Sequence, residues 1–145
     1  MLTVRPMEAK DLCRVTAIEK ETFSIPWSEK AFSDSMNLPY TIYLVAETPD
    51  AQIAGYCGLY QVFSEGEITN VAVAPAYRRQ GVAGTMLTQL LEQGKHRGIE
   101  SFFLEVRRSN LSARRLYEKL GFCGDGIRKN FYEKPREDAV IMWKR

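Results

Sequence analysis

The segment at residues 69–83 constrains the fold more than any other part of the chain. Its Val-Ala-Val stretch at 71–73 is typical of a β-strand, Pro75 ends that strand, and a long helix is predicted to begin at Val82. A strand that leads through a turn into a helix N-terminus can bind an anion, because free backbone N–H groups and the helix dipole point the same way. The sequence therefore predicts a pyrophosphate-binding loop between a strand and a helix.

The residues of this loop exclude two common nucleotide-binding motifs. Arg78 and Arg79 supply positive charge, and Gly81 lets a ligand approach the backbone closely. A Walker loop requires Lys and then Ser or Thr after its last glycine, whereas Gly81 is followed by Val82 and Ala83. A dinucleotide fingerprint requires three glycines directly after an early strand, which this mid-chain segment lacks. The alternative to a nucleotide loop is a basic turn before an ordinary amphipathic helix.

The chain has the length and composition of one globular domain. Its 145 residues predict a single domain over residues 1–145, large enough to bury a hydrophobic core. No stretch approaches the roughly 20 apolar residues of a membrane span, and the N-terminus lacks an apolar signal region. We therefore expect a cytoplasmic protein that contacts no membrane. The net charge of +2 is too small to indicate nucleic-acid binding.

Cysteine and histidine are too few and too scattered to indicate a metal centre or a nucleophile–histidine triad. Cys13, Cys57 and Cys123 are isolated among apolar neighbours, and we expect them to be buried thiols in a reducing cytoplasm. His96, the only histidine, lies in a Gly-Lys-His-Arg-Gly stretch that is typical of a helix end. The sequence therefore predicts no metal and no disulfide.

Hydrophobic periodicity predicts alternating strands and helices along the whole chain. Strands are expected at residues 2–6, 40–47, 53–63, 67–74, 101–106, 122–132 and 139–143, and helices at residues 8–23, 28–36, 82–95 and 110–120. The nearly all-apolar strand at 101–106 is expected to be buried on both faces. A strand, helix, strand order around the loop implies a parallel pair joined by a right-handed crossover. The expected architecture is a mixed α/β sheet covered by helices.

Two motifs together resemble those of the GNAT superfamily of N-acetyltransferases. The first is Arg78-x-x-Gly81-x-Ala83, which is similar to the acetyl-CoA loop of that superfamily. The second lies at residues 104–122, where a strand carries Glu105, Asn110 begins a helix, and Leu-Tyr and Gly-Phe pairs follow. The resemblance implies a mostly antiparallel central sheet, flanked by helices, with a parallel pair at the acetyl-CoA site. It also implies acetyl-CoA as co-substrate.

Within that superfamily, the chain is most similar to RimI-type ribosomal-protein alanine N-acetyltransferases. The similar segments are Pro-Trp-Ser at 26–28, Leu-Glu-Val-Arg at 104–107, and Arg-Lys-Asn-Phe-Tyr at 128–132. The resemblance implies acetylation of the N-terminal alanine of small-subunit ribosomal protein eighteen, with no direct contact to nucleic acid. Lys129 and Phe131 stand where Arg and Tyr are common in that family. These departures bear on peptide specificity more than on chemistry.

The resemblance also implies roles for individual residues. Glu105 is implied as the general base and Tyr117 as the general acid, with Glu67 as a rival base. The residues implied to bind acetyl-CoA are Val71, Ala72, Val73, Arg78, Arg79, Gln80, Gly81, Val82, Ala83, Gly84 and Asn110. The candidates for binding the acceptor are Trp27, Glu67, Asn130 and Tyr132. The alternative for Trp27 and Tyr132 is an ordinary core or surface aromatic. The alternatives are that Glu105 forms an ion pair with Arg107 and that Tyr117 is only a packed ring.

The chemistry favours an α-amine as acceptor. An α-amino group has a pKa of about 7.7–8.0, so a sizeable fraction is neutral near neutral pH, whereas a lysine near 10.4 is almost wholly protonated. One carboxylate acting through water is therefore a sufficient base for a protein N-terminus. The alternatives are acetylation of lysine side chains, polyamines or another small amine, and a CoA-binding module without catalysis. A peptide enzyme leaves an open groove for the acceptor, whereas a small-molecule enzyme encloses it in a pocket.

Overall fold

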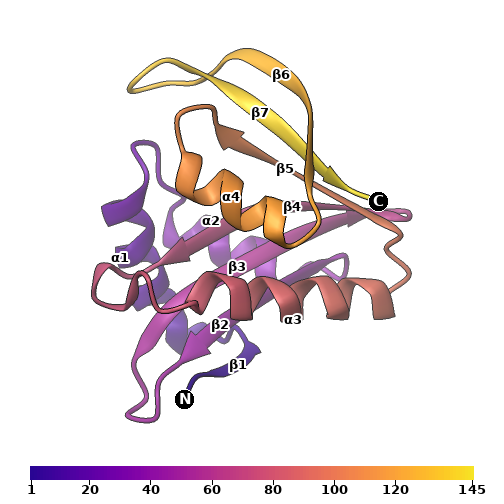
Figure 1. Ribbon diagram of the computed structural model, residues 1–145. Helices are drawn as coiled ribbons and strands as arrows, with labels where there is room; N and C mark the ends of the chain where they lie inside the picture. Colours follow the sequence, from indigo (N-terminus) through magenta and orange to yellow (C-terminus); the bar gives the residue numbers. More distant parts are fainter.

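Seven strands form one sheet in the computed structural model, which describes residues 1–145. The strands are β1 (Thr3–Pro6), β2 (Thr41–Glu47), β3 (Ile53–Val62), β4 (Glu65–Val73), β5 (Ser101–Arg107), β6 (Cys123–Tyr132) and β7 (Glu137–Lys144). Their spatial order is β1-β2-β3-β4-β5-β7-β6 (Figure 1). All neighbours are antiparallel except β4 and β5, which are parallel. The predicted mixed, mostly antiparallel sheet with one parallel pair is confirmed.

Four α-helices cover the two faces of the sheet. They are α1 (Leu12–Thr22), α2 (Glu29–Met36), α3 (Val82–His96) and α4 (Leu111–Lys119). α1 and α2 pack from one face on β2, β3 and β4, whereas α3 packs from the other face. α4 lies on the same face as α3, in front of the sheet in Figure 1. No helix is both long and apolar enough to cross a membrane.

Local capping explains where two of the helices begin and end. Ser28 caps α2, because its Oγ accepts a hydrogen bond from the Ala31 backbone N–H at 3.1 Å. Asn110 caps α4 in the same way, through a 3.2 Å bond from the Ala113 N–H to Asn110 Oδ1. Gly121 follows α4 with φ +98°, the left-handed conformation that ends many helices. All three positions were predicted from the sequence and are confirmed.

The sheet separates two hydrophobic cores. The larger core joins α3 to the sheet and includes Leu87, Leu90, Phe102 and Leu104. The smaller core lies under α1 and α2 and includes Ile18, Phe32 and Tyr56. Phe32, Leu87, Leu90 and Tyr56 are completely inaccessible to solvent. Burial on both faces fixes the central strands and therefore the residues that project from their ends.

Two sequence predictions about burial are wrong. Cys57 is buried, but Cys13 and Cys123 are exposed, because each lies on an outward surface of its element. Strand β5 is buried on one face only, with Phe102, Leu104 and Val106 inside and the alternate residues partly exposed. The reason is that α1 and α2 pack on β2, β3 and β4 and leave the same face of β5 without a helix.

Candidate active site

The parallel pairing of β4 and β5 stops after three residue pairs. The paired residues are 65–67 of β4 and 101–103 of β5. Beyond them, β4 continues to Val73 and β5 to Arg107, but the two strands no longer pair with each other. We call the unpaired region, between residues 68–73 of β4 and 104–107 of β5, the sheet opening. One edge of β4 in the sheet opening has no strand neighbour, so its backbone groups are free to bind an extended ligand.

A β-bulge in β4 sets which side chains face which side of the sheet opening. Asn70 pairs with Gly58 and Ile68 with Leu59, so Thr69 is an extra residue without a partner. Ile68 joins the core under α3, but Ala72 joins the core under α1 and α2. The bulge therefore reverses the alternation within β4, and it places Val71 and Val73 on the α3 side.

Two carboxylates lie on the opposite face from α3 and α4. Glu67 precedes Ile68, and Glu105 lies between Leu104 and Val106, all three of which are buried in the α3 core. Because side chains alternate along a strand, Glu67 and Glu105 project to the other face. Burial raises the pKa of the Glu67 carboxyl, and the charge of Glu105 raises that pKa further. The two predicted candidates for the base are thus brought together.

Glu105 pairs with a cation that the sequence did not single out for it. Arg128 Nε lies 3.0 Å from Glu105 Oε2, and that oxygen is buried and receives no hydrogen bond. Arg107, the partner expected in the alternative interpretation, instead pairs with Glu137 at 3.2 Å. The alternative prediction, an ion pair between Glu105 and Arg107, is therefore wrong, because Glu105 pairs with Arg128 instead. Because Arg128 approaches from β6, two strands away, no local sequence pattern could identify it.

Two tyrosines approach the sheet opening from α4 and β6. Tyr117 is buried, packs edge-on against Phe122, and makes no hydrogen bond within the protein. Burial raises the pKa of Tyr117, and Tyr132 and Cys57 raise it further. Burial and the nearby Glu105 raise the pKa of Tyr132 to about 12. Both phenols therefore keep their protons at neutral pH and can donate them.

The predicted loop forms a turn that is ordered by its own residues. The Arg78 Nε donates a 3.0 Å hydrogen bond to the carbonyl oxygen of Val73. Arg79 and Gly81 have left-handed φ angles of +63° and +77°. Gly81 is the N-cap of α3, and it makes no side-chain capping bond, so the first N–H groups of α3 lack a side-chain partner there. The predicted turn and helix N-terminus are therefore present, and anion binding there stays a prediction.

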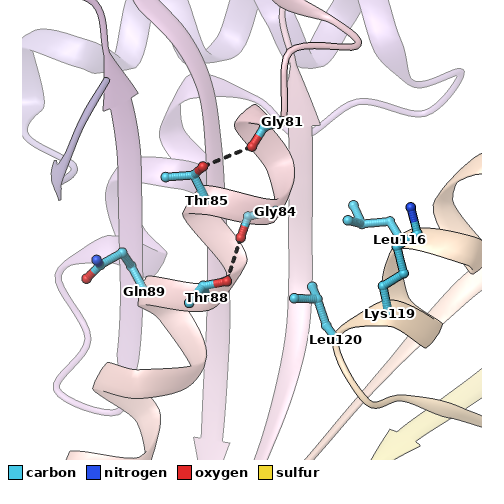
Figure 2. Close-up of a pocket in the computed structure, with 8 residues that line it drawn as sticks. All are labelled: Gly81, Gly84, Thr85, Thr88, Gln89, Leu116, Lys119 and Leu120. Atoms are coloured by element: carbon cyan, nitrogen blue, oxygen red, sulfur yellow. Dashed lines mark hydrogen bonds between the residues drawn. The ribbon is translucent and has the colours of Figure 1, made fainter. Parts of the chain in front are cut away.

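An open groove of about 510 Å³ lies between α3 and α4 (Figure 2). Its lining residues are Gly81, Gly84, Thr85, Thr88, Gln89, Leu116, Lys119 and Leu120. Gly81 and Gly84 were predicted from the sequence to bind acetyl-CoA, but the other six lining residues were not predicted. Thr85 and Thr88 lie one helical turn apart on the groove side of α3, and that i, i+3 spacing was a usable signal. Nothing in the sequence indicated that α4 faces this turn.

The remaining predicted residues lie around the face that carries Glu105. Trp27 packs against Phe32 with ring centroids 5.2 Å apart, so it is partly a core residue. Tyr132 lies under the Arg107 guanidinium, 4.5 Å from the ring centroid. Asn130 is exposed, and its backbone N–H donates to Asp138 Oδ1 at 2.9 Å. These three are divided between the loop before α2 and the end of β6 rather than gathered in one pocket.

Two loops that border this face are tied together. Ser24 Oγ, which follows α1, donates a 3.2 Å hydrogen bond to the Glu133 carbonyl, which follows β6. Arg107 donates to the carbonyl oxygens of Glu133 and Pro135 at 3.0 and 2.9 Å. The loops at residues 23–28 and 133–136 are therefore held in a fixed relation to β5. No group of three or more His, Cys, Asp and Glu side chains is arranged to hold a metal ion.

Comparisons with known proteins agree with this geometry. A Bacillus subtilis relative, provisionally named as a ribosomal protein bS18-alanine N-acetyltransferase, is 41% identical, covering 97% of this chain and 93% of the relative. The Escherichia coli ribosomal protein bS18-alanine N-acetyltransferase is 37% identical, covering 98% of this chain and 96% of the relative. The crystal structure of the ribosomal-protein-S18-alanine N-acetyltransferase from Escherichia coli superposes with a TM-score of 0.90, over 99% of this chain and 93% of that one, at 35% identity.

The sequence profile of the acetyltransferase (GNAT) family matches residues 12–122 of the chain. This range contains α1, the loop before α3, the sheet opening and α4. The family profile, the relatives and the sheet opening thus agree, and the chain belongs to the GNAT family of acetyltransferases.

Proposed function

We propose that this chain transfers the acetyl group of acetyl-CoA to the N-terminal alanine of a small-subunit ribosomal protein, the reaction for which its relatives are named. The observation that carries the proposal is the sheet opening, which has an anion-binding helix N-terminus on one face and two carboxylates on the other. A ribosomal acceptor implies that the enzyme acts in the cytoplasm. It requires no metal and no direct contact with nucleic acid.

Acetyl-CoA fits the α3 side of the sheet opening. The free edge of β4 at Val71, Ala72 and Val73 offers hydrogen bonds of the kind that an extended amide chain such as pantetheine makes. The N–H groups at residues 79–84 would bind the pyrophosphate, with Arg78, Arg79 and Gln80 beside it. Asn110, which caps α4, would contact the CoA chain near its thiol through its free amide. Lys119 in the groove adds a cation for a further phosphate.

The acceptor amine would reach the thioester from the opposite face. Glu105, acting through water, removes a proton from the α-ammonium, and the neutral amine then attacks the acetyl carbonyl carbon. The resulting tetrahedral intermediate collapses with cleavage of the carbon–sulfur bond. Tyr117 donates its proton to the leaving sulfur, so CoA departs as the thiol, and the second proton lost from the nitrogen passes through water to restore the Tyr117 phenol. Trp27, Asn130 and Tyr132 would line the path of the acceptor peptide.

A covalent acetyl-enzyme is not needed for this reaction. Cys57 lies near Tyr117, and it is inaccessible to solvent. Burial raises the pKa of the Cys57 thiol well above its ordinary value, so almost no thiolate is present at neutral pH. The exposed Cys13 lies on α1, away from the sheet opening. These facts support direct transfer from the thioester to the amine.

Mass spectrometry of two acceptor peptides tests the proposed acceptor. One peptide carries the ribosomal protein sequence with a free N-terminal alanine, and the other has that N-terminus blocked and its lysines free. We expect a single added acetyl group on the first peptide only. Acetylation of the blocked peptide would indicate lysine as the acceptor instead. Acetylation of neither peptide, with acetyl-CoA still bound, would indicate a small amine or a non-catalytic role.

Replacing Tyr117 by Phe tests the general acid. The ring is buried and its hydroxyl bonds to no protein group, so Tyr117→Phe preserves the packing against Phe122. We expect turnover to fall by at least about tenfold, with unchanged melting temperature and acetyl-CoA affinity. The matched control is Tyr40→Phe, which removes a hydroxyl from a partly exposed ring before β2. Equal turnover in both variants would remove Tyr117 from the mechanism.

A further inference from the structure

Arg128 connects the edge of the sheet to the carboxylates at the sheet opening. It lies on the outermost strand β6, opposite Ala139 of β7, and reaches past β7 to Glu105 on β5. The Arg128 side chain is 56% exposed, whereas the Glu105 side chain is 11% exposed. A mostly exposed guanidinium is therefore in contact with a mostly buried carboxylate.

This contact is the ion pair that the buried oxygen of Glu105 forms. Glu105 Oε2 receives no hydrogen bond, so its 3.0 Å approach to Arg128 Nε is an ion pair without hydrogen-bond alignment. An ion pair of this kind attracts the carboxylate but leaves its lone pairs free to accept a proton or a water molecule. The contact therefore suits a carboxylate that has to act as a base.

The other charged and titratable groups around Glu105 are already engaged or are neutral. Arg107 pairs with Glu137, and its guanidinium lies over the Tyr132 ring. Tyr132 is a neutral phenol at neutral pH, because burial and Glu105 raise its pKa to about 12. Glu67, from β4, is the further carboxylate at this place, and the charge of Glu105 raises its pKa. Arg128 is thus the cation that serves both Glu67 and Glu105.

We propose that Arg128 is a positioning residue, which holds Glu105 at the sheet opening and prevents Glu105 and Glu67 from sharing a proton. Two adjacent carboxylates without a cation retain one proton between them to higher pH. With Arg128 in place, a positive charge stands beside both carboxylates when the acceptor ammonium arrives. This inference rests on the proposed role of Glu105 as base.

The balance of charges on Glu67 supports this inference. Burial raises the pKa of Glu67, Glu105 raises it further, and Arg128 lowers it. Removing the guanidinium therefore leaves only effects that favour protonation. For a base, a raised pKa means that activity is lost at a higher pH as the solution is acidified.

Four variants and the pH dependence of kcat/KM test the role of Arg128. In Arg128→Gln we expect the acidic limb to move upward by about one pH unit. Arg128→Lys retains a charge and is expected to move it less. Adding Glu67→Gln to Arg128→Gln removes the second carboxylate and is expected to return the limb to lower pH. The matched control is Lys129→Gln, which removes the same charge from the next residue, whose side chain forms no ion pair or hydrogen bond.

A titration without substrates separates this inference from the proposed function. Carbon-13 NMR of the side-chain carboxyl carbons, assigned with Glu67→Gln and Glu105→Gln, follows both glutamates in the free enzyme. We expect their midpoints to move upward in Arg128→Gln and to stay in place in Lys129→Gln. Unchanged midpoints in Arg128→Gln would overturn the inference. Shifted midpoints with an unchanged rate profile would confirm the action of Arg128 on the pair and reject Glu105 as the base.

Discussion

Replacing Glu105 by Gln is expected to lower kcat/KM for N-terminal acetylation by at least about 100-fold. Gln keeps the size of the side chain but cannot accept a proton, so the amine has to lose its proton to solvent. Glu105 is largely buried, faces away from the α3 core and forms its ion pair with Arg128. Affinity for acetyl-CoA is expected to be unchanged, because the proposed CoA contacts lie on the other face of the sheet opening.

The matched variant is Glu67→Gln, which makes the same change on the neighbouring strand. Burial and the charge of Glu105 raise the pKa of Glu67, so Glu67 takes up a proton at a higher pH than an ordinary glutamate does. We expect Glu67→Gln to retain most activity and to keep the acidic limb of the pH profile, shifted to lower pH. Loss of that limb in Glu67→Gln but not in Glu105→Gln would assign the base to Glu67 instead.

Replacing Glu19 by Ala is expected to cost about 3 kcal/mol of unfolding free energy and to lower the melting temperature by about 10 °C. Glu19 lies on α1 and is 3% exposed. One of its oxygens accepts from the Tyr56 hydroxyl, and the other accepts from the Trp27 backbone N–H at 3.0 Å. Truncation leaves both buried or partly buried donors without a partner and also leaves a cavity.

This substitution is also expected to weaken acceptor binding. The bond from Trp27 to Glu19 fixes the loop at residues 23–28, which borders the face that carries Glu105. We expect the KM for the peptide to rise severalfold in Glu19→Ala, with little change in the KM for acetyl-CoA. Glu19→Gln can still accept the hydrogen bond from Trp27, so its KM for the peptide is expected to rise less than that of Glu19→Ala. If the melting temperature falls no further than in Glu21→Ala, an exposed position on the same helix, the buried network has no stabilising role.

Most of the fold could be predicted because its signals are local. Strand alternation, helical spacing and capping residues such as Ser28 and Asn110 each act within a few positions of the chain. The strand, break, turn and helix around Gly81 could be located in the same way. The observed bounds differ from the predicted ones mainly at the ends, as at α1, which begins at Leu12 after a 3₁₀ turn.

The parts that could not be predicted depend on contacts between distant segments. The bulge at Thr69 shows only in the register of β4 against β3, and that register decides which side each residue faces. Arg128 reaches Glu105 across β7, which lies between β6 and β5 in the sheet although it follows both strands in the chain. The contact therefore depends on a strand order that differs from the sequence order. The groove between α3 and α4 requires two helices to meet across the end of the sheet, so the place of Lys119 in it has no sequence signature.

The early end of the β4–β5 ladder has a kinetic consequence. A continuous sheet keeps ligands on its two faces apart, whereas here the pairing of β4 with β5 ends after three residue pairs and leaves the facing strand edges unpaired. Under the proposed function, donor and acceptor enter from opposite sides, so neither blocks the entry or exit of the other. Both can be resident at once, and the two products can leave in either order. Under the proposed function, this break in the hydrogen bonding of the sheet is what makes a ternary complex accessible.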